Sequence, residues 1–300
     1  MKKTCSFFVF LMMLAIPFST AADDFLRGDC NEDGKVSITD VTCLINYLLS
    51  GSWDVTPDDP QSETVTYVLN GIEINMVHVE GGTFTMGASG TDTEAADDEF
   101  PAHIVTLSDY YICTTEVTQQ LWRAVMSSNP SNHTGNPLCP VERVSWNDCQ
   151  TFIAQLNDIT GMSFRLPTEA EWEFAARGGN KSNGYKYAGS NDVNEVAWFW
   201  DSTLGASNMT RPVATKLPNE LGLYDMSGNV YEWCSDWYDN YYNTDATINP
   251  QGPSSGTHRV YRGGSWQGGS RFCRVSSRKG EKPTILSNWT GLRLAMSFPE

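Results

Sequence analysis

One short capped helix followed by a long, turn-rich stretch is the feature that most limits how this 300-residue chain can fold. Thr168 and Glu171 form a capping box, and the helix is expected to run from Glu169 to Arg177 before Gly178-Gly179 ends it. The rest of the chain reads as short strands separated by Gly, Asn and Pro turns. Ten Trp, twelve Tyr and thirteen Phe are available to fill a core. The pattern indicates one sizeable, loop-heavy domain with an aromatic core.

Further elements are expected upstream of this helix. A helix should begin near Thr118, and a second should begin after Ser145, which forms an approximate capping box with Asp148. The apolar face of that second helix consists of Phe152, Ile153, Leu156 and Ile159, and Gly161 closes it. Residues 76–87 alternate apolar and polar side chains around Gly81-Gly82, which predicts a β-hairpin.

The first residues have the three-part pattern of a secretory signal. Lys2 and Lys3 precede an apolar run from Phe7 to Phe18, and small residues follow from Ser19 to Ala22. The apolar run is shorter than the roughly 20 residues that span a bilayer. We therefore expect residues 1–21 to be a cleaved signal peptide, and the mature protein to be secreted or periplasmic and not membrane-spanning.

Residues 29–40 have the spacing of a calcium-binding loop. Gly34 permits the sharp turn at position six, and Lys35 can offer its carbonyl at position seven. The expected ligands are Asp29, Asn31, Asp33, Lys35, Ser37 and Asp40. The helix stripe that follows consists of Val41, Leu44, Ile45 and Leu48 and stops at Gly51. The alternative interpretation of the loop is an acidic turn without a metal.

This loop and helix, at residues 23–51, resemble one half of a type I dockerin. Dockerins carry two such loops, whereas the acidic, Pro-containing stretch from Trp53 to Gln61 holds no second one. We assign residues 52–70 to a linker and residues 71–300 to the main domain. The loop could tether the protein to a partner or only stabilise its own segment.

Charge and motif searches exclude several classes of function. A formal charge of -16 and a pI near 4.6 argue against a nucleic-acid surface. The four histidines show no metal-ligand spacing, and Ser265 lacks the Gly-x-Ser-x-Gly context of a hydrolase nucleophile. Seven cysteines remain after Cys5 of the leader is set aside, so in an oxidising compartment at least one is unpaired or pairs between chains.

Three stretches in order resemble the formylglycine-generating-enzyme, or sulfatase-modifying-factor, family. They run from Arg165 to Gly179, from Asn219 to Trp233, and from Arg262 to Trp266 with residues 291–294. Residues 80–87 and 111–122 fit as well, so the resemblance covers about three quarters of the chain. It implies a C-type-lectin-like α+β fold with much irregular structure.

The resemblance also implies a second calcium site. Asp225 and Glu232 would offer carboxylates, and Gly228 and Val230 would offer carbonyl oxygens, which is a suitable ligand set for a hard cation. The alternative is that Asp225 and Glu232 cap turns and pair with nearby arginines. The family's other calcium site has only Asp201 as an obvious donor within residues 195–201.

The family's aerobic enzymes bind Cu(I) between two cysteines five residues apart. Gly268 and Cys273 occupy those positions here, and one thiolate cannot form a two-sulfur site. We therefore expect calcium and no copper, with Cys273 as the one residue left of the catalytic pair. Alone, it is more typical of a buried small residue or a disulfide partner than of a nucleophile.

Three functions remain under consideration. The favoured one is a binding or scaffold module that contacts a peptide, glycan or protein through an aromatic, C-terminal groove. The residues expected to line this groove are Trp266, Arg271, Arg274, Arg278 and Trp289. The alternative interpretation is that these five residues belong to the core or to ion pairs. The other two functions are an active oxidase that converts a sulfatase cysteine and a C-type-lectin-like receptor that displays residues 262–294.

Overall fold

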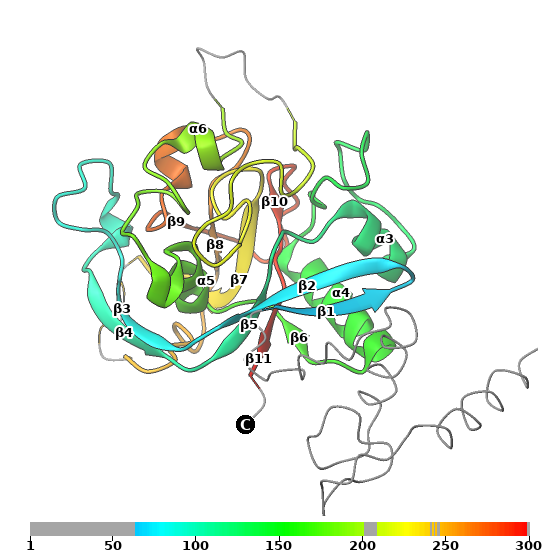
Figure 1. Cartoon of the computed structure of the whole chain (residues 1–300), viewed down its shortest axis with the longest axis horizontal. Coiled ribbons are helices and arrows are strands. Elements are labelled where there is room, and N and C mark those ends of the chain that lie inside the picture. Colours follow the sequence, from blue (N-terminus) through cyan, green and yellow to red (C-terminus); the bar gives the residue numbers. More distant parts are fainter. Residues whose placement is uncertain (1–63, 201–208, 241, 243, 245–246, 299–300) are drawn as a thin grey trace, which may run out of the picture. The chain divides into compact units, whose positions relative to one another are not determined.

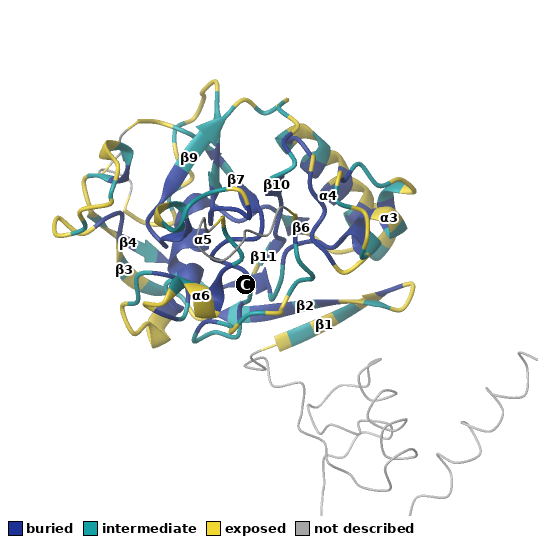
Figure 2. Ribbon diagram, turned by 90° about the horizontal axis from the view of Figure 1, so that it is seen from above, coloured by how far each residue is buried: buried dark blue, intermediate teal, exposed yellow. Residues whose placement is uncertain are grey.

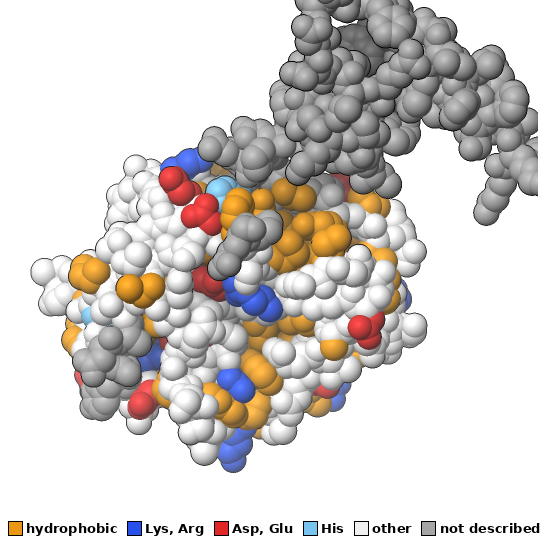
Figure 3. All heavy atoms as spheres, turned by 90° about the horizontal axis from the view of Figure 1, so that it is seen from below, with side chains coloured by type: hydrophobic (Ala, Val, Ile, Leu, Met, Phe, Trp, Pro, Cys, Tyr) orange, Lys and Arg blue, Asp and Glu red, His pale blue; other side chains and the backbone are white. Residues whose placement is uncertain are grey.

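The computed structural model describes residues 64–200, 209–240, 242, 244 and 247–298. All of them belong to the compact unit that runs from Glu63 to Glu300 (Figure 1). No described helix is long and apolar enough to cross a bilayer. On the face shown in Figure 3, charged side chains of both signs lie scattered among neutral ones, and hydrophobic side chains form one larger patch and several smaller groups.

A five-stranded antiparallel sheet joins the first described strand to the last. Its order is β1-β2-β5-β11-β6, so the C-terminal strand β11 lies between two strands from the first half of the domain (Figure 1). The strands are β1 (Thr64–Leu69), β2 (Ile72–Val79), β5 (Tyr110–Cys113), β6 (Phe164–Arg165) and β11 (Ala295–Ser297). The domain is therefore closed by contacts between residues far apart in the sequence.

Two helices pack against this sheet. They are α3 (Gln119–Met126), whose cap is Thr118, and α4 (Trp146–Thr160), which runs from the Ser145–Asp148 capping box to Gly161 in the left-handed conformation. Trp122 of α3 stacks on Phe152 of α4, with ring centroids 4.7 Å apart. Both predicted helices are confirmed, and their apolar faces form one of the hydrophobic clusters of the core.

A second sheet carries the residues between the helices and the C-terminus. Its order is β10-β7-β8-β9, with β10 parallel to β7 and the other pairs antiparallel. The strands are β7 (Tyr231–Trp237), β8 (Arg259–Arg262), β9 (Arg278–Glu281) and β10 (Thr290–Gly291). Helix α5 (Glu169–Ala176) starts at the Thr168–Glu171 capping box and contacts β7 and β8. Figure 2 shows α5 and β7 in the dark blue of the buried interior.

Shorter elements complete the domain. A two-stranded ribbon pairs β3 with β4, and α5 also contacts both of these strands. One short α-helix and three 3-10 turns lie in the connecting segments. The elements are β3 (Gly82–Met86), β4 (His103–Leu107), α6 (Val193–Val196), η1 (Asp97–Glu99), η2 (Gly179–Lys181) and η3 (Ser270–Cys273).

Two sequence-based expectations for the start of the domain are wrong. The predicted hairpin of residues 76–87 does not form, because β2 pairs with β1 and β5 whereas β3 pairs with β4. The second half of the expected linker, residues 52–70, contains β1, which pairs along its length with β2. Alternation of Val65, Tyr67 and Leu69 toward the core explains why this stretch is a strand.

Five cysteines lie among the described residues, and all five are buried free thiols: Cys113, Cys139, Cys149, Cys234 and Cys273. They lie in strands, loops and helices of the core, where each is packed by neighbouring side chains. They therefore act as small apolar residues in this part of the chain. Cys30 and Cys43 lie outside the described residues.

Candidate functional site

The loop that leads into β7 brings two predicted calcium ligands into the interior. Asp225 and Glu232 are both buried, and the backbone between them turns through Gly228 and Asn229 with φ of 86° and 57°. Asp225 itself has φ of 59°, which is uncommon for a residue with a side chain. The local conformation is therefore a tight turn that aims polar groups inward.

Glu232 is already engaged by protein donors. Arg293 donates from Nη2 to its Oε1 at 2.7 Å and from Nε to its Oε2 at 2.9 Å, and Trp172 donates from Nε1 to Oε2 at 2.6 Å. Arg293 is fully buried and also donates to the carbonyls of Cys113 and Tyr224. Glu232 is thus part of a buried ion pair that links β7 to the segment before β11.

Asp225 has only half of its acceptor capacity used. Its Oδ2 accepts a hydrogen bond of 2.7 Å from the Ala214 backbone N–H, whereas its Oδ1 is buried and has no partner among the described residues. Burial raises the pKa of Asp225 to about 6, because the charged form loses its hydration and the nearby Glu232 carboxylate repels it. An unpaired buried carboxylate oxygen is costly unless a cation or a proton satisfies it.

A third buried carboxylate, Glu116, completes the cluster and was not predicted from the sequence. It lies between β5 and α3, where its oxygens accept hydrogen bonds from the Val230 N–H at 3.0 Å and from Asn229 Nδ2 at 2.7 Å. Burial and the carboxylates of Asp225 and Glu232 hold its pKa well above the usual range. No local spacing distinguishes Glu116, because its partners lie more than a hundred positions away.

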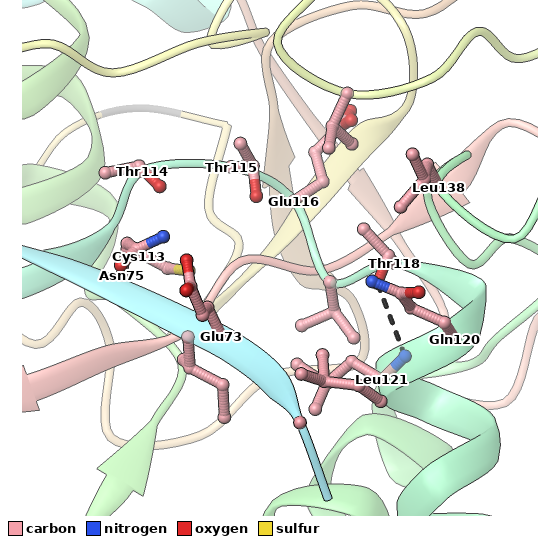
Figure 4. Close-up of a pocket in the computed structure, with 15 residues that line it drawn as sticks. Glu73, Asn75, Cys113, Thr114, Thr115, Glu116, Thr118, Gln120, Leu121 and Leu138 are labelled. Carbon is pink, nitrogen blue, oxygen red and sulfur yellow. Dashed lines mark hydrogen bonds between the residues drawn. The ribbon is translucent and has the colours of Figure 1, made fainter. Parts of the chain in front are cut away.

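The Glu116 segment borders a cavity of about 370 Å³. Figure 4 shows the turn between β1 and β2, the segment from Cys113 to Thr118 and Leu138 around it. Glu73 and Asn75 of β2 face this cavity together with Thr114 and Thr115 (Figure 4). The lining is rich in carboxylate, amide and hydroxyl oxygen, so the surroundings of the buried cluster are acidic and polar.

The charge balance of the cluster fits a bound cation. Glu116, Asp225 and Glu232 place three carboxylates in the interior, while Arg293 supplies one positive charge. The described residues contain no group of three His, Cys, Asp or Glu spaced to hold a metal by themselves, so carbonyls such as those of Gly228 and Val230 would have to complete the shell. The orphaned Asp225 oxygen and the uncompensated charge are what a calcium ion would satisfy.

The two positions that hold copper-binding cysteines in the family's aerobic enzymes, Gly268 and Cys273, have surroundings unlike those of the carboxylate cluster. Cys273 ends η3, is completely buried and packs in an apolar cluster with Tyr187, Val196 and Ala197. Burial raises the pKa of its thiol to about 12. Gly268 lies on the preceding turn, where its carbonyl accepts a hydrogen bond of 2.9 Å from the Trp200 N–H. A buried thiol in apolar surroundings is disfavoured as a metal-binding thiolate, and Gly268 has no side chain to add a second ligand.

Three of the five predicted ligand-contact residues are buried, and two of them are arginines held in ion pairs. Arg274 is bound by Glu99 and Asp92 at distances of 2.6 to 2.8 Å, and Arg278 is bound on two nitrogens by Glu169 at 2.7 Å. Their donors are buried and occupied, so these arginines do not form the expected groove and match the alternative of ion-pair residues. The carboxylate of Glu99 is also buried and is paired with Arg274.

The other three predicted contact residues differ in exposure. Trp266 is buried, as Arg274 and Arg278 are, and donates from Nε1 to the Asn288 carbonyl at 3.0 Å. Arg271 is exposed and lies 4.4 Å from the centre of the Phe272 ring. Trp289 is partly exposed and lines a cavity of about 250 Å³. Trp289 therefore combines partial exposure with a concave surface.

Several predicted features lie outside the described residues. They are the leader at residues 1–21, the ligands Asp29, Asn31, Asp33, Lys35, Ser37 and Asp40, and Asp201. These features remain predictions from the sequence.

Comparison with known proteins gives matches over both parts of the chain. The family described as "Sulfatase-modifying factor enzyme 1-like domain" matches residues 69–298, and the family described as "Dockerin type I domain" matches residues 27–68. The "Chaperone protein LppX" of Paenibacillus barcinonensis is 34% identical over 67% of this chain and 82% of its own length. The formylglycine-generating enzyme of Streptomyces coelicolor is 31% identical over 73% of this chain and 88% of its own length. The solved structure of Treponema denticola variable protein 1 superimposes with a TM-score of 0.70 at 31% identity, over 78% of this chain and 99% of that one.

Proposed function

Because the chain belongs to the family of sulfatase-modifying factor enzyme 1-like domains, we propose that it is an exported, calcium-binding member that lacks copper oxidase activity and acts as a ligand-binding module. The expected α+β fold of the C-type-lectin-like, formylglycine-generating-enzyme type is confirmed. The domain follows a dockerin type I repeat. Such repeats bind calcium, occur in extracellular proteins and mediate interactions with cohesins.

The state of the cysteine position carries the proposal that oxidase chemistry is absent. Cu(I) binds soft thiolates, and a thiolate forms near neutral pH only when the thiol pKa is low. Burial in an apolar cluster moves the pKa of Cys273 to about 12, away from that range. Gly268 offers no second sulfur and no other side-chain ligand. In the metal-free protein one position therefore holds a neutral thiol and the other holds no sulfur.

Calcium would have a structural role in this proposal. Glu116, Asp225 and Glu232, with the carbonyls of Gly228 and Val230, are the residues that would hold it. When bound, the ion supplies positive charge to a buried region in which carboxylates outnumber arginines. The residues themselves fix the turn before β7 and connect it to α3 and to the segment before β11 through Glu116 and Arg293.

A peptide assay tests the missing oxidase activity. The mature full-length protein is incubated with Cu(I), oxygen, a reductant and a Cys-x-Pro-x-Arg peptide, and the peptide mass is followed for conversion of thiol to aldehyde. An active family enzyme serves as the positive control and Cys273→Ala as the matched variant. We expect an unchanged peptide mass with both forms of this protein. Conversion that disappears in Cys273→Ala would establish the alternative, an active oxidase that acts on a sulfatase cysteine.

A further inference from the structure

The cavity of about 250 Å³ near Trp289 is separate from both sites described above. It is lined by Asn132, Arg143, Leu286, Ser287, Asn288 and Trp289, and these residues define the Arg143 pocket. They come from two segments: the stretch between α3 and α4 and the loop before β10. The pocket is therefore built where two distant parts of the chain meet.

The backbone on one side of the pocket is held in place by hydrogen bonds. The Ser287 carbonyl accepts hydrogen bonds from the Arg143 N–H at 3.0 Å and from the Thr290 N–H at 3.2 Å. The next carbonyl, that of Asn288, accepts the indole N–H of Trp266 at 3.0 Å. Ser287 and Asn288 are thus fixed by their main chains, which leaves their side chains free of this structural task.

The other side of the pocket is fixed by a buried carboxylate. Glu142 is fully buried, and its Oε1 accepts hydrogen bonds from the backbone N–H groups of Asn132 and His133. The His133 ring then packs edge-on against Trp266, with centroids 5.0 Å apart. The Oε2 of Glu142 is buried and has no hydrogen-bond partner, and among the described residues no ion pair joins Glu142 to the adjacent Arg143.

The side chains that face the pocket have unused hydrogen-bonding groups. Within the described part of the chain, no side-chain hydrogen bond or ion pair engages Arg143, Asn132, Asn288 or Trp289, although the interior arginines 262, 274, 278 and 293 are all paired. Arg143 also has φ of 62°, a conformation that is uncommon outside glycine and found at binding sites. Arg143 and Asn132 are exposed, so their donors are open to a ligand on a backbone that hydrogen bonds hold in place.

The donors define the chemistry of the ligand. The pocket offers more hydrogen-bond donors than acceptors, from the Arg143 guanidinium, the amides of Asn132 and Asn288, the Ser287 hydroxyl and the Trp289 indole. The guanidinium pairs best with an oxyanion that can accept two parallel hydrogen bonds. Trp289 adds a flat apolar face and Leu286, 55% exposed, an apolar edge. The cavity is smaller than the roughly 300–1,000 Å³ of sites for drug-sized molecules, so it suits one ring. In a chain with 36 acidic and 20 basic residues, attraction of an anion here is local.

We propose that the Arg143 pocket binds an acidic sugar unit of a glycan, with the anionic group on Arg143, the ring on Trp289 and the hydroxyls on Asn132 and Asn288. This inference rests on the proposed binding function and names its ligand class. The anionic group is a carboxylate or a sulfate ester, two oxyanions that arginine recognises in the same way. A single-ring pocket rich in amide groups matches a sugar better than a peptide, which would need a larger apolar anchor.

The test measures binding of four probes to the full-length protein by titration calorimetry. They are trigalacturonic acid, its methyl ester, a trigalactose bearing sulfate esters, and a peptide of three glutamates. We expect at least one acidic trisaccharide to bind, the methyl ester to bind at least tenfold more weakly than the free acid if the free acid binds, and the peptide to show no comparable affinity. Absence of binding to both acidic trisaccharides, or equal binding of the peptide, overturns the proposal.

Variants locate the site. Arg143→Asn keeps a residue that tolerates positive φ and removes the charge, and it should weaken binding at least tenfold, as should Trp289→Ala. Arg143→Lys should retain part of the affinity, and Arg123→Gln on the exposed face of α3 should leave it unchanged. Unaltered binding by Arg143→Asn and Trp289→Ala overturns the assignment of this pocket. That failure leaves the proposed function standing, whereas a positive peptide-oxidation assay defeats the proposed function whatever the pocket binds.

Discussion

The carboxylate cluster around Asp225 and the cysteine position around Cys273 are linked by a hydrogen bond from Ser227 Oγ to the Cys273 carbonyl, but their electrostatic surroundings are opposite. The carboxylate cluster holds more negative charge than its protein partners neutralise, with one Asp225 oxygen unpaired. Cys273 is a neutral thiol surrounded by apolar side chains, and position 268, where the family's aerobic enzymes have the second cysteine, is a glycine.

The comparison distinguishes residues that hold the fold together from residues that only copper chemistry would require. Glu116 and Glu232 connect elements distant in sequence, so their loss would disturb the domain itself. A second thiol at position 268 would connect nothing, because that turn is held by its backbone. We therefore expect the fold to tolerate the absence of a cysteine at position 268 but not the loss of the carboxylates.

The largest effect is expected from breaking the Arg293–Glu232 pair. Arg293→Met leaves a buried carboxylate without its counter-ion and should lower the free energy of unfolding by about 3–5 kcal/mol. Urea denaturation of the two proteins measures it, with Arg123→Met as the exposed control expected within about 0.5 kcal/mol of the parent. A loss below about 1 kcal/mol for Arg293→Met would mean that the cluster is not the structural centre described here.

The next effect is a pH-dependent stabilisation by calcium. The pKa of Asp225 is about 6 in the metal-free folded protein and about 3.9 when unfolded, so its contribution is fully present below about pH 4 and is lost as the pH rises through 6. The loss amounts to at most roughly 3 kcal/mol. Calcium should restore stability most at pH 7 and least below pH 5, where protons compete for the carboxylate.

Thermal unfolding with calcium or a chelator at pH 5 and pH 7 measures this dependence. Asp225→Asn is the matched control, because it keeps the shape and removes the titrating charge. The control isolates the Asp225 site from the dockerin-like repeat, since calcium bound by that repeat is common to both proteins. If both proteins gain equally from calcium at pH 7, the domain's calcium is not held at Asp225.

A smaller effect is expected at the thiol. Cys273→Ser places a hydroxyl in the apolar cluster of Tyr187, Val196 and Ala197 and should cost about 1–3 kcal/mol, more than Cys273→Ala. The Cys273 thiol should also resist alkylation at pH 8 in the folded protein, because a pKa of about 12 leaves almost no thiolate. Peptide mapping by mass spectrometry follows that site, and rapid labelling would contradict its buried, neutral state.

The smallest effect is expected at Gly268. A β-carbon at this position would meet the Phe272 ring at 3.3 Å, a contact that a small shift relieves, so Gly268→Cys should change stability by less than about 1 kcal/mol. Gly264→Ala is the contrasting variant, because φ is 79° there and the added carbon would lie 2.8 Å from Cys273 Sγ. Comparable unfolding midpoints for the two variants would show that the glycine at 268 is as constrained as that at 264.

Local signals in the sequence predicted the helices well. Thr118, Ser145 and Thr168 cap helices within a few positions, and Gly161 ends α4, because these effects act between near neighbours. The hairpin at residues 76–87 failed for the opposite reason. Its alternation was correct for strands, but their partners β1, β5 and β4 are decided by packing across the domain.

The candidate site shows the same limit. Asp225 and Glu232 were predicted from their place in a motif, whereas Glu116 joins them only through hydrogen bonds that the fold creates. Arg274 and Arg278 were expected on a surface, yet carboxylates from other elements hold them in the interior. Arg143 carries no sequence signal at all, and only its pocket and its positive φ distinguish it.

Competition for Cu(I) tests the central claim most directly. The full-length protein and Cys273→Ala are titrated against a chromogenic Cu(I) chelator under reducing, oxygen-free conditions, so that cysteines elsewhere in the chain contribute equally to both. We expect the two proteins to withdraw the same amount of copper, because Cys273 is a buried, neutral thiol and position 268 offers no second sulfur. One additional equivalent of tightly bound Cu(I) in the parent would contradict it and restore the oxidase as the leading function.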